Sequence, residues 1–226
     1  MRAGLLHAWT ITKKDLRSEV RAASAVITMV LLGFLVVLVF SFSMEAGSRD
    51  SALARSGVLW AAFLFPGLLA VGRSFEGEKE AQCLEGLLLC PVDRGAIYLG
   101  KLLGSLILSF ASGFLVLVFF TVLYDVGLGL KWLALLGVMF LVATGLAAVG
   151  TLSAAITAGV RARGALLTVL VLPLLVPLLI GAARCSVVLL GAEPWNGLGL
   201  WPVFMAIYDV LFMAVGFVLF DYVVEG

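Results

Sequence analysis

Long apolar stretches recur along this chain of 226 residues and restrict its fold more than any other feature. Only 13% of the residues are charged, whereas soluble domains carry about 25%. A helix that crosses a bilayer needs roughly 20 apolar residues, and strands of that length would be unusual. We therefore predict an all-α integral membrane protein with a single transmembrane domain over 1–226. Its six expected spans are 22–44, 52–72, 95–124, 131–158, 165–183 and 200–223.

The positions of lysine and arginine favour one orientation of these spans, because cytoplasmic loops carry an excess of both residues. With a cytoplasmic N-terminus, the outside segments hold four of the chain's 15 Lys and Arg residues, and the other 11 fall inside. The expected topology therefore places both termini and the polar segment 73–101 in the cytoplasm. The four outside residues are Arg49, Arg55, Lys131 and Arg184.

Residues 5–21 are amphipathic. Leu6, Trp9 and Leu16 can share much of one helical face, while Lys13 and Arg17 lie elsewhere. Such a helix lies in the headgroup plane of a membrane and leads into the first span. The alternative is a disordered basic leader. A cleaved signal peptide is not expected, because the polar lead and the apolar run are both too long for one.

The polar segment 73–101 holds four of the 15 basic and five of the 14 acidic residues of the chain. Within it, 76–89 are predicted to form a short cytoplasmic helix with leucines on one side and glutamates on the other. Pro91 ends this helix, because proline cannot continue the hydrogen-bond ladder. Asp93 can then cap the helix that becomes the third span. An insert of this kind in a membrane protein usually contacts a soluble partner.

The residues from Gly95 to Lys101 fit the phosphate-binding pattern G-x-x-x-x-G-K, but the context argues against a nucleotide site. Leu102 stands where a magnesium-binding Ser or Thr is needed, no strand precedes the motif, and a span follows at once. The single histidine, His7, and three cysteines without metal-binding spacing give no metal cluster. We expect no catalytic residue, no metal site and no enzymatic activity in this chain.

Two features of the C-terminal half leave alternatives open. Asp209 lies inside the last span, where a carboxylate is either functional or structural, the latter through a hydrogen bond to a neighbouring helix or a position closer to the outer interface. Residues 184–193 are largely apolar but too short to cross a membrane. They form either a re-entrant half-helix or the end of a tilted fifth span.

An interfacial helix, six spans and a cytoplasmic helix between the second and third spans resemble the membrane subunit of ABC-2-type exporters. Two segments, 14–21 and 73–101, resemble more closely the CcmB family, the permease subunit of the ABC transporter of bacterial cytochrome c maturation. Cys90 departs from the small residue, such as alanine, that this family leads us to expect. The residues that carry the family pattern are Asp15, Glu19, Arg21, Arg73, Pro91, Arg94 and Lys101.

The resemblance implies several partners in the bacterial inner membrane. They are a CcmA-like ATPase, which would bind ATP and Mg²⁺, CcmC- and CcmD-like membrane proteins, a CcmE-like haem chaperone and a second copy of this chain. It also implies that ATP hydrolysis by the partner is linked to release of the haem-loaded chaperone. No histidine lies in a predicted span, so the sequence offers no evident axial haem ligand, and we expect no directly bound cofactor. The expected ATPase contacts of the helix at 76–89 are Glu78, Glu80, Leu84, Glu85, Leu87 and Leu88.

Three other functions fit parts of the sequence. A generic ABC-2 exporter permease for a lipid, drug or polysaccharide has the same architecture. An assembly scaffold that transports nothing is the second alternative. A secondary transporter coupled through Asp209 would need no ATPase, but no inverted repeat supports this class.

Overall fold

The computed structural model describes residues 2–21, 23–44, 51–80, 94–127, 129–157, 163–191 and 194–225. These residues form helices and no β-strand. Six helices in this part of the chain are long and apolar enough to cross a membrane, which confirms the predicted all-α, six-span fold class. The helices are α1 (Arg2–Arg21), α2 (Ala23–Ser43), α4 (Ala52–Glu80), α6 (Arg94–Leu123), α7 (Leu130–Ile156), α8 (Arg163–Leu190) and α9 (Trp201–Glu225), with a short 3-10 helix η1 (Trp195–Leu198) before α9.

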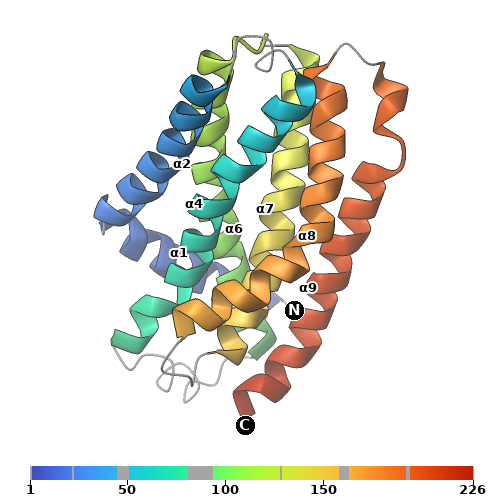
Figure 1. The fold of residues 1–226 in the computed structure, drawn as a ribbon. Helices are drawn as coiled ribbons and strands as arrows, with labels where there is room; N and C mark the ends of the chain where they lie inside the picture. The colour runs from blue at the N-terminus through green and yellow to red at the C-terminus, as the bar shows by residue number, and fades with distance from the viewer. Residues whose placement is uncertain are drawn as a thin grey trace.

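Helix α7 lies at the centre of the bundle and packs against α4, α6, α8 and α9 (Figure 1). In its apolar stretch 67% of the residues are buried, against 28% in α2 and 28% in the last span. Small residues permit this central position, because they let neighbouring helices approach closely. Gly150 rests against Val71 of α4, and Gly145 lies against Leu178 of α8 and Asp209 of α9.

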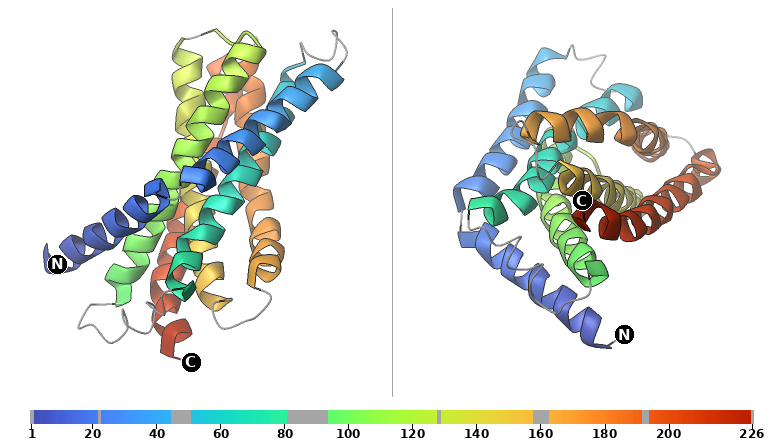
Figure 2. Two further views of the ribbon diagram at one scale, coloured as in Figure 1. Left: turned by 90° about the vertical axis from the view of Figure 1, so that its left-hand side faces the viewer. Right: turned by 90° about the horizontal axis from the view of Figure 1, so that it is seen from below.

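Helix α1 lies outside the bundle and crosses α6 at a steep angle (Figure 2). Helix α1 ends at Arg21 and α2 begins at Ala23, where the amphipathic segment gives way to the first apolar run. The C-terminal ends of α4 and α7 and the N-terminal ends of α6 and α8 lie at the same end of the bundle as the C-terminus of the chain (Figure 1). Helix α1 lies toward this end as well.

The ends of two helices differ from the sequence-based expectation. Helix α4 continues past residue 72 to Glu80, so 76–80 belong to the same helix as the second span and do not begin a separate helix. No proline follows Pro66 in this helix, and Glu78, Lys79 and Glu80 are good helix formers. Residues 81–93, which include most of the expected cytoplasmic helix, lie outside the described residues.

Helix α8 runs without interruption to Leu190, so 184–190 continue the fifth span and do not form a re-entrant half-helix. Cys185 and Leu189 are buried in the bundle, so this end of α8 packs as an ordinary part of the core. Two side chains of α4 bind it there. The indole Nε1 of Trp60 donates to Ser186 Oγ at 2.9 Å, and Ser56 Oγ donates to the carbonyl of Ala183 at 3.1 Å.

Candidate functional site

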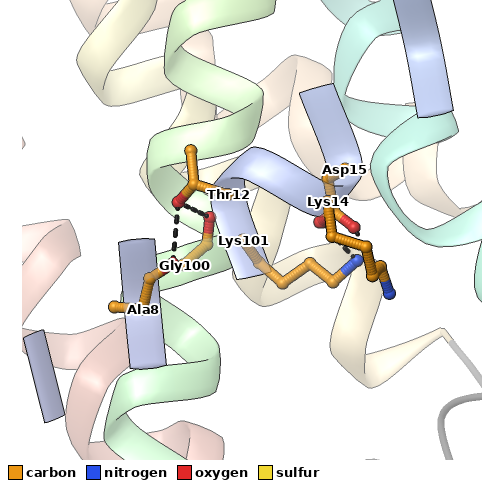
Figure 3. A network of polar contacts seen from close by, with 6 residues as sticks. All are labelled: Ala8, Thr12, Lys14, Asp15, Gly100 and Lys101. Atoms are coloured by element: carbon orange, nitrogen blue, oxygen red, sulfur yellow. Dashed lines mark hydrogen bonds and ion pairs between the residues drawn. The ribbon is translucent and has the colours of Figure 1, made fainter. Parts of the chain in front are cut away.

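The contact between α1 and α6 brings together two residues selected from the sequence, Asp15 and Lys101. Their side chains form an ion pair in which Lys101 Nζ lies 2.8 Å from Asp15 Oδ2 (Figure 3). The Lys101 side chain is 1% exposed and that of Asp15 is 12% exposed. Lys14 also approaches the carboxylate, at 3.5 Å from Oδ1, but is 48% exposed. The pair is therefore a largely desolvated charge contact between α1 and α6.

A second polar contact lies one turn before the ion pair on α1. Thr12 is 1% exposed, and its hydroxyl donates to the carbonyl oxygens of Ala8 and Gly100, at 3.0 Å each (Figure 3). Gly100 is needed at this point, because a Cβ there would lie 2.9 Å from the Ala8 carbonyl oxygen and from Ile11 Cβ. The glycine thus allows the two backbones to meet closely enough for the Thr12 hydrogen bond.

One face of α1 makes this contact and another faces outward. Ala8, Ile11 and Thr12 are buried, whereas Leu6 and Trp9 are 65% and 58% exposed. An exposed leucine and tryptophan on a helix beside the bundle suit the headgroup region of a membrane. The amphipathic pattern therefore identified the outward face, while the face that packs on α6 was not recognised from the sequence.

The first turns of α6 also pack against α9. The ring of Tyr98 is fully buried, lies against Gly216 and stacks at a tilt on Phe220, with 5.5 Å between the ring centroids. Gly95 lies against the ring of Phe217. We call Gly95, Tyr98, Gly100 and Lys101 the α6 junction, because these residues connect the start of α6 to α1 on one side and to α9 on the other. A displacement of this part of α6 would reach both helices.

The structure describes only some of the other residues of the family pattern. Arg94 is the first residue of α6, Glu19 and Arg21 belong to the last turn of α1, and Arg73 is half-buried in α4. The side chains of Arg94, Glu19 and Arg21 are outside the described part of the chain. Of the expected ATPase contacts, Glu78 and Glu80 have described backbone only, in the last turns of α4. Leu84, Glu85, Leu87 and Leu88 lie outside the described residues, as does Pro91.

Asp209 lies away from the α6 junction, in the middle of the last span. It is 3% exposed, and neither carboxylate oxygen has a hydrogen-bond partner among the described residues. The adjacent Tyr208 hydroxyl donates to the carbonyl of Leu174 in α8, at 2.5 Å. A hydrogen bond from Asp209 to a neighbouring helix, one of the alternatives for this residue, is thus not found in the described part of the chain.

The described residues join helices at this place and hold no metal cluster. The described residues contain no group of three His, Cys, Asp or Glu side chains that would hold a metal ion. His7, the chain's single histidine, is exposed on α1. The α6 junction instead joins three helices through one ion pair, one hydroxyl and three close glycine contacts.

Comparison with known proteins gives a consistent match. The family model described as CcmB protein matches residues 6–218. The chain is 33% identical to Heme exporter protein B of Escherichia coli strain K12 over 176 residues, which cover 77% of this chain and 79% of that protein. It is 31% identical to Heme exporter protein B of Paracoccus denitrificans over 189 residues, 82% of this chain and 85% of that protein. The protein of the same name from Rhodobacter capsulatus is 32% identical over 178 residues, 77% of this chain and 79% of its own length.

Proposed function

The chain belongs to the CcmB family, and from this premise we propose that it is the permease subunit of an ABC-type haem exporter complex of cytochrome c maturation. In this proposal a separate CcmA-like subunit hydrolyses ATP. This chain converts the nucleotide-driven movement of that subunit into a movement of its membrane helices. The result is release of a haem-loaded, CcmE-like chaperone for cytochrome c assembly. The observation that carries the proposal is the α6 junction.

The ATPase would bind at the end of the bundle where α4 ends and α6 begins. Glu78 and Glu80 lie in the last turns of α4 and Arg94 opens α6, so 81–93 connect two helix ends that lie at the same end of the bundle (Figure 1). A partner bound to this connection acts on both helices at once. The excess of Lys and Arg in the segments at this end supports a cytoplasmic location.

Movement would then pass from α6 to α1 and α9. The ion pair between Asp15 and Lys101 resists separation of α1 from α6, because separating the pair would break a close contact between two largely buried charges. Tyr98 contacts Gly216 of α9, and Gly95 contacts Phe217 of the same helix. Close packing of this kind transmits displacement, since packed interiors have low compressibility. The three helices therefore move as a unit when the start of α6 is pushed.

Haem itself would be held mainly by partner proteins. The sequence has one histidine, and it is exposed on α1, so this chain supplies no histidine ligand from its membrane spans. CcmC- and CcmD-like proteins and the chaperone are the proposed haem-handling partners. ATP and Mg²⁺ belong to the CcmA-like subunit in this proposal.

The decisive experiment is to uncouple the two subunits without unfolding the spans. We would purify the complex carrying Glu85→Lys or Leu87→Ala and measure its ATPase rate, and measure holocytochrome c formation in cells. Both substitutions are expected to reduce cytochrome c formation several-fold while this chain still inserts in the membrane. The control is Leu133→Ala, at a residue of α7 that is 61% exposed. Unchanged ATPase rate and unchanged cytochrome c yield in both variants would overturn the proposal.

A further inference from the structure

Asp209 is a carboxylate enclosed by apolar groups. It projects from α9 toward the centre of the bundle, where a Cβ added to Gly145 of α7 would lie 2.6 Å from its Oδ1 atom and 2.5 Å from Leu178 Cδ2 of α8. The absence of a side chain at Gly145 thus provides the space that the carboxylate occupies. Among described residues, no Lys, Arg or His pairs with Asp209, and neither oxygen accepts a hydrogen bond.

The titratable group beside Asp209 is Tyr208, and its hydroxyl is already used. It donates to the Leu174 carbonyl of α8, so its proton points away from the carboxylate. Helix α7 presents Gly145 at this place and α8 presents Leu174 and Leu178. No group described around Asp209 is positioned to stabilise a negative charge.

The free energy needed to bury a negative charge determines whether Asp209 is ionised or protonated. An isolated ionised carboxylate in an apolar environment is far more costly to bury than a neutral polar group. Charged residues within membrane spans are therefore paired, hydrated or neutral. Asp209 is 3% exposed and has no partner among the residues that the structure describes.

We propose that Asp209 is a proton-binding site inside the membrane-spanning bundle. Its carboxyl group carries a proton while α7 and α9 are in contact around Gly145. When the two helices separate and water reaches the carboxyl, the O–H bond breaks, the electron pair stays on the carboxylate oxygen and the proton passes to water. The step needs no oxidant, reductant or cofactor.

The position of Asp209 connects this proton to the α6 junction. Gly216 follows Asp209 by seven residues, about two helical turns, so the two residues lie on nearly the same face of α9. Gly216 contacts Tyr98 of α6, and Asp209 contacts α7 at Gly145. Movement of α6 would therefore act on α9 close to the carboxyl group. This connection rests on the proposed function, whereas the bound proton does not.

Infrared spectroscopy tests the proton directly. The wild-type protein and Asp209→Asn, each purified with its partner subunits into lipid nanodiscs, are compared at neutral pH. The difference spectrum is expected to contain the carbonyl stretch of a protonated carboxylic acid, shifted to lower frequency in heavy water. A difference spectrum that shows only carboxylate bands would overturn the proposal. ATPase activity does not enter this measurement, so its outcome is independent of the proposed coupling.

A second measurement uses only the wild-type chain, in case Asp209→Asn fails to assemble. An apolar carbodiimide forms stable adducts with protonated carboxyl groups in apolar surroundings, and peptide mapping locates them. We expect an adduct on Asp209 at neutral pH, a smaller yield at alkaline pH, and none on Asp125, which is exposed after α6. Modification of Asp125 without Asp209 would contradict a proton held at Asp209.

Discussion

Lys101 carries a positive charge into a contact that leaves 1% of its side chain exposed, with Asp15 at 2.8 Å. Removal of one member of a buried ion pair takes away the closest partner of the remaining charge and costs roughly 3–5 kcal/mol. We therefore expect Lys101→Ala to lower the free energy of unfolding by about 3 kcal/mol. Denaturant titration of the purified protein in detergent measures this loss, and holocytochrome c formation should fall with it.

Lys14 provides the control for this substitution. It approaches the same carboxylate at 3.5 Å but is 48% exposed, so Lys14→Ala should cost less than about 1 kcal/mol. The double variant Asp15→Ala/Lys101→Ala should lose less stability than the sum of the two single variants, because the two groups interact directly. Equal losses for Lys14→Ala and Lys101→Ala would show that the buried pair is unimportant.

Gly145 offers a second test at the scale of a single residue. A Cβ at this position would lie 2.5 Å from Leu178 Cδ2 and 2.6 Å from Asp209 Oδ1. Overpacking of this kind costs roughly 1–3 kcal/mol, so Gly145→Ala should destabilise the protein by that amount in the same titration. Gly137→Ala on the same helix is the matched control, because no atom lies within 4 Å of its added Cβ. A Gly145→Ala protein as stable as the control would contradict the close contact of α7 with α8 and α9.

The sequence alone could identify single residues of the candidate site but not their pairing. Asp15 and Lys101 were both selected from it, yet nothing local indicates that they meet, because the contact depends on how α1 crosses α6. Thr12 was missed altogether, although it lies on the same side of α1 as Ala8 and Asp15. The sequence offered little indication that Thr12 is buried, since a threonine near an N-terminal basic segment usually faces solvent.

At the scale of the elements, α1 depends on a narrow contact with α6. A Cβ at Gly100 would lie 2.9 Å from the Ala8 carbonyl oxygen and from Ile11 Cβ, whereas one at Gly104 would meet Asp15 Cβ only at 3.8 Å. Gly100→Ala should therefore push α1 away from α6 and Gly104→Ala should not. The expected result is several-fold faster tryptic cleavage after the exposed residues Lys13 and Arg17 in Gly100→Ala. Equal cleavage rates in the two variants would contradict the contact.

Helix positions were more predictable than helix ends. Apolar length locates a span because the bilayer thickness sets the length that is needed. The ends depend on weaker signals. A change from apolar to charged residues after Gly72 does not stop a helix, so α4 continues to Glu80. Likewise Arg184 does not interrupt α8, which continues to Leu190 because the following residues are apolar and contain no helix breaker.

At the scale of the whole molecule, the sequence predicted six spans but not their arrangement. The central place of α7 follows from its small residues and its four packed neighbours, two of which, α4 and α9, are not adjacent to it in the chain. Apolar content did not distinguish this buried helix from α2, because lipid-facing helices are equally apolar. The burial of Asp209 depends on the same arrangement, since α7 and α8 supply the surfaces that enclose it.

The orientation of the bundle in the membrane is a further prediction at this scale. Gly127 follows α6 and Ser18 lies on α1, and both are exposed. In a variant without native cysteines, Gly127→Cys should react with a membrane-impermeant thiol reagent in intact spheroplasts. Ser18→Cys should react only after the membrane is opened, because the Lys and Arg distribution places α1 inside.

The effect of charge on the orientation in the membrane can be tested with substitutions that remove charge and leave the packing of the helices unchanged. Cytoplasmic Lys and Arg near the spans set orientation, and long apolar helices insert whichever way they face. Exposed charges on α1, such as Lys13 and Arg17, can be replaced by glutamine without altering the buried contact of Thr12 and Asp15 with α6. The Gly127→Cys reaction should then persist, because basic residues also flank α4 and α6 on the same side. Labelling of Ser18→Cys in intact spheroplasts, together with protection of Gly127→Cys, would show that the orientation is the opposite of the one predicted. The α6 junction would then lie away from any cytoplasmic ATPase.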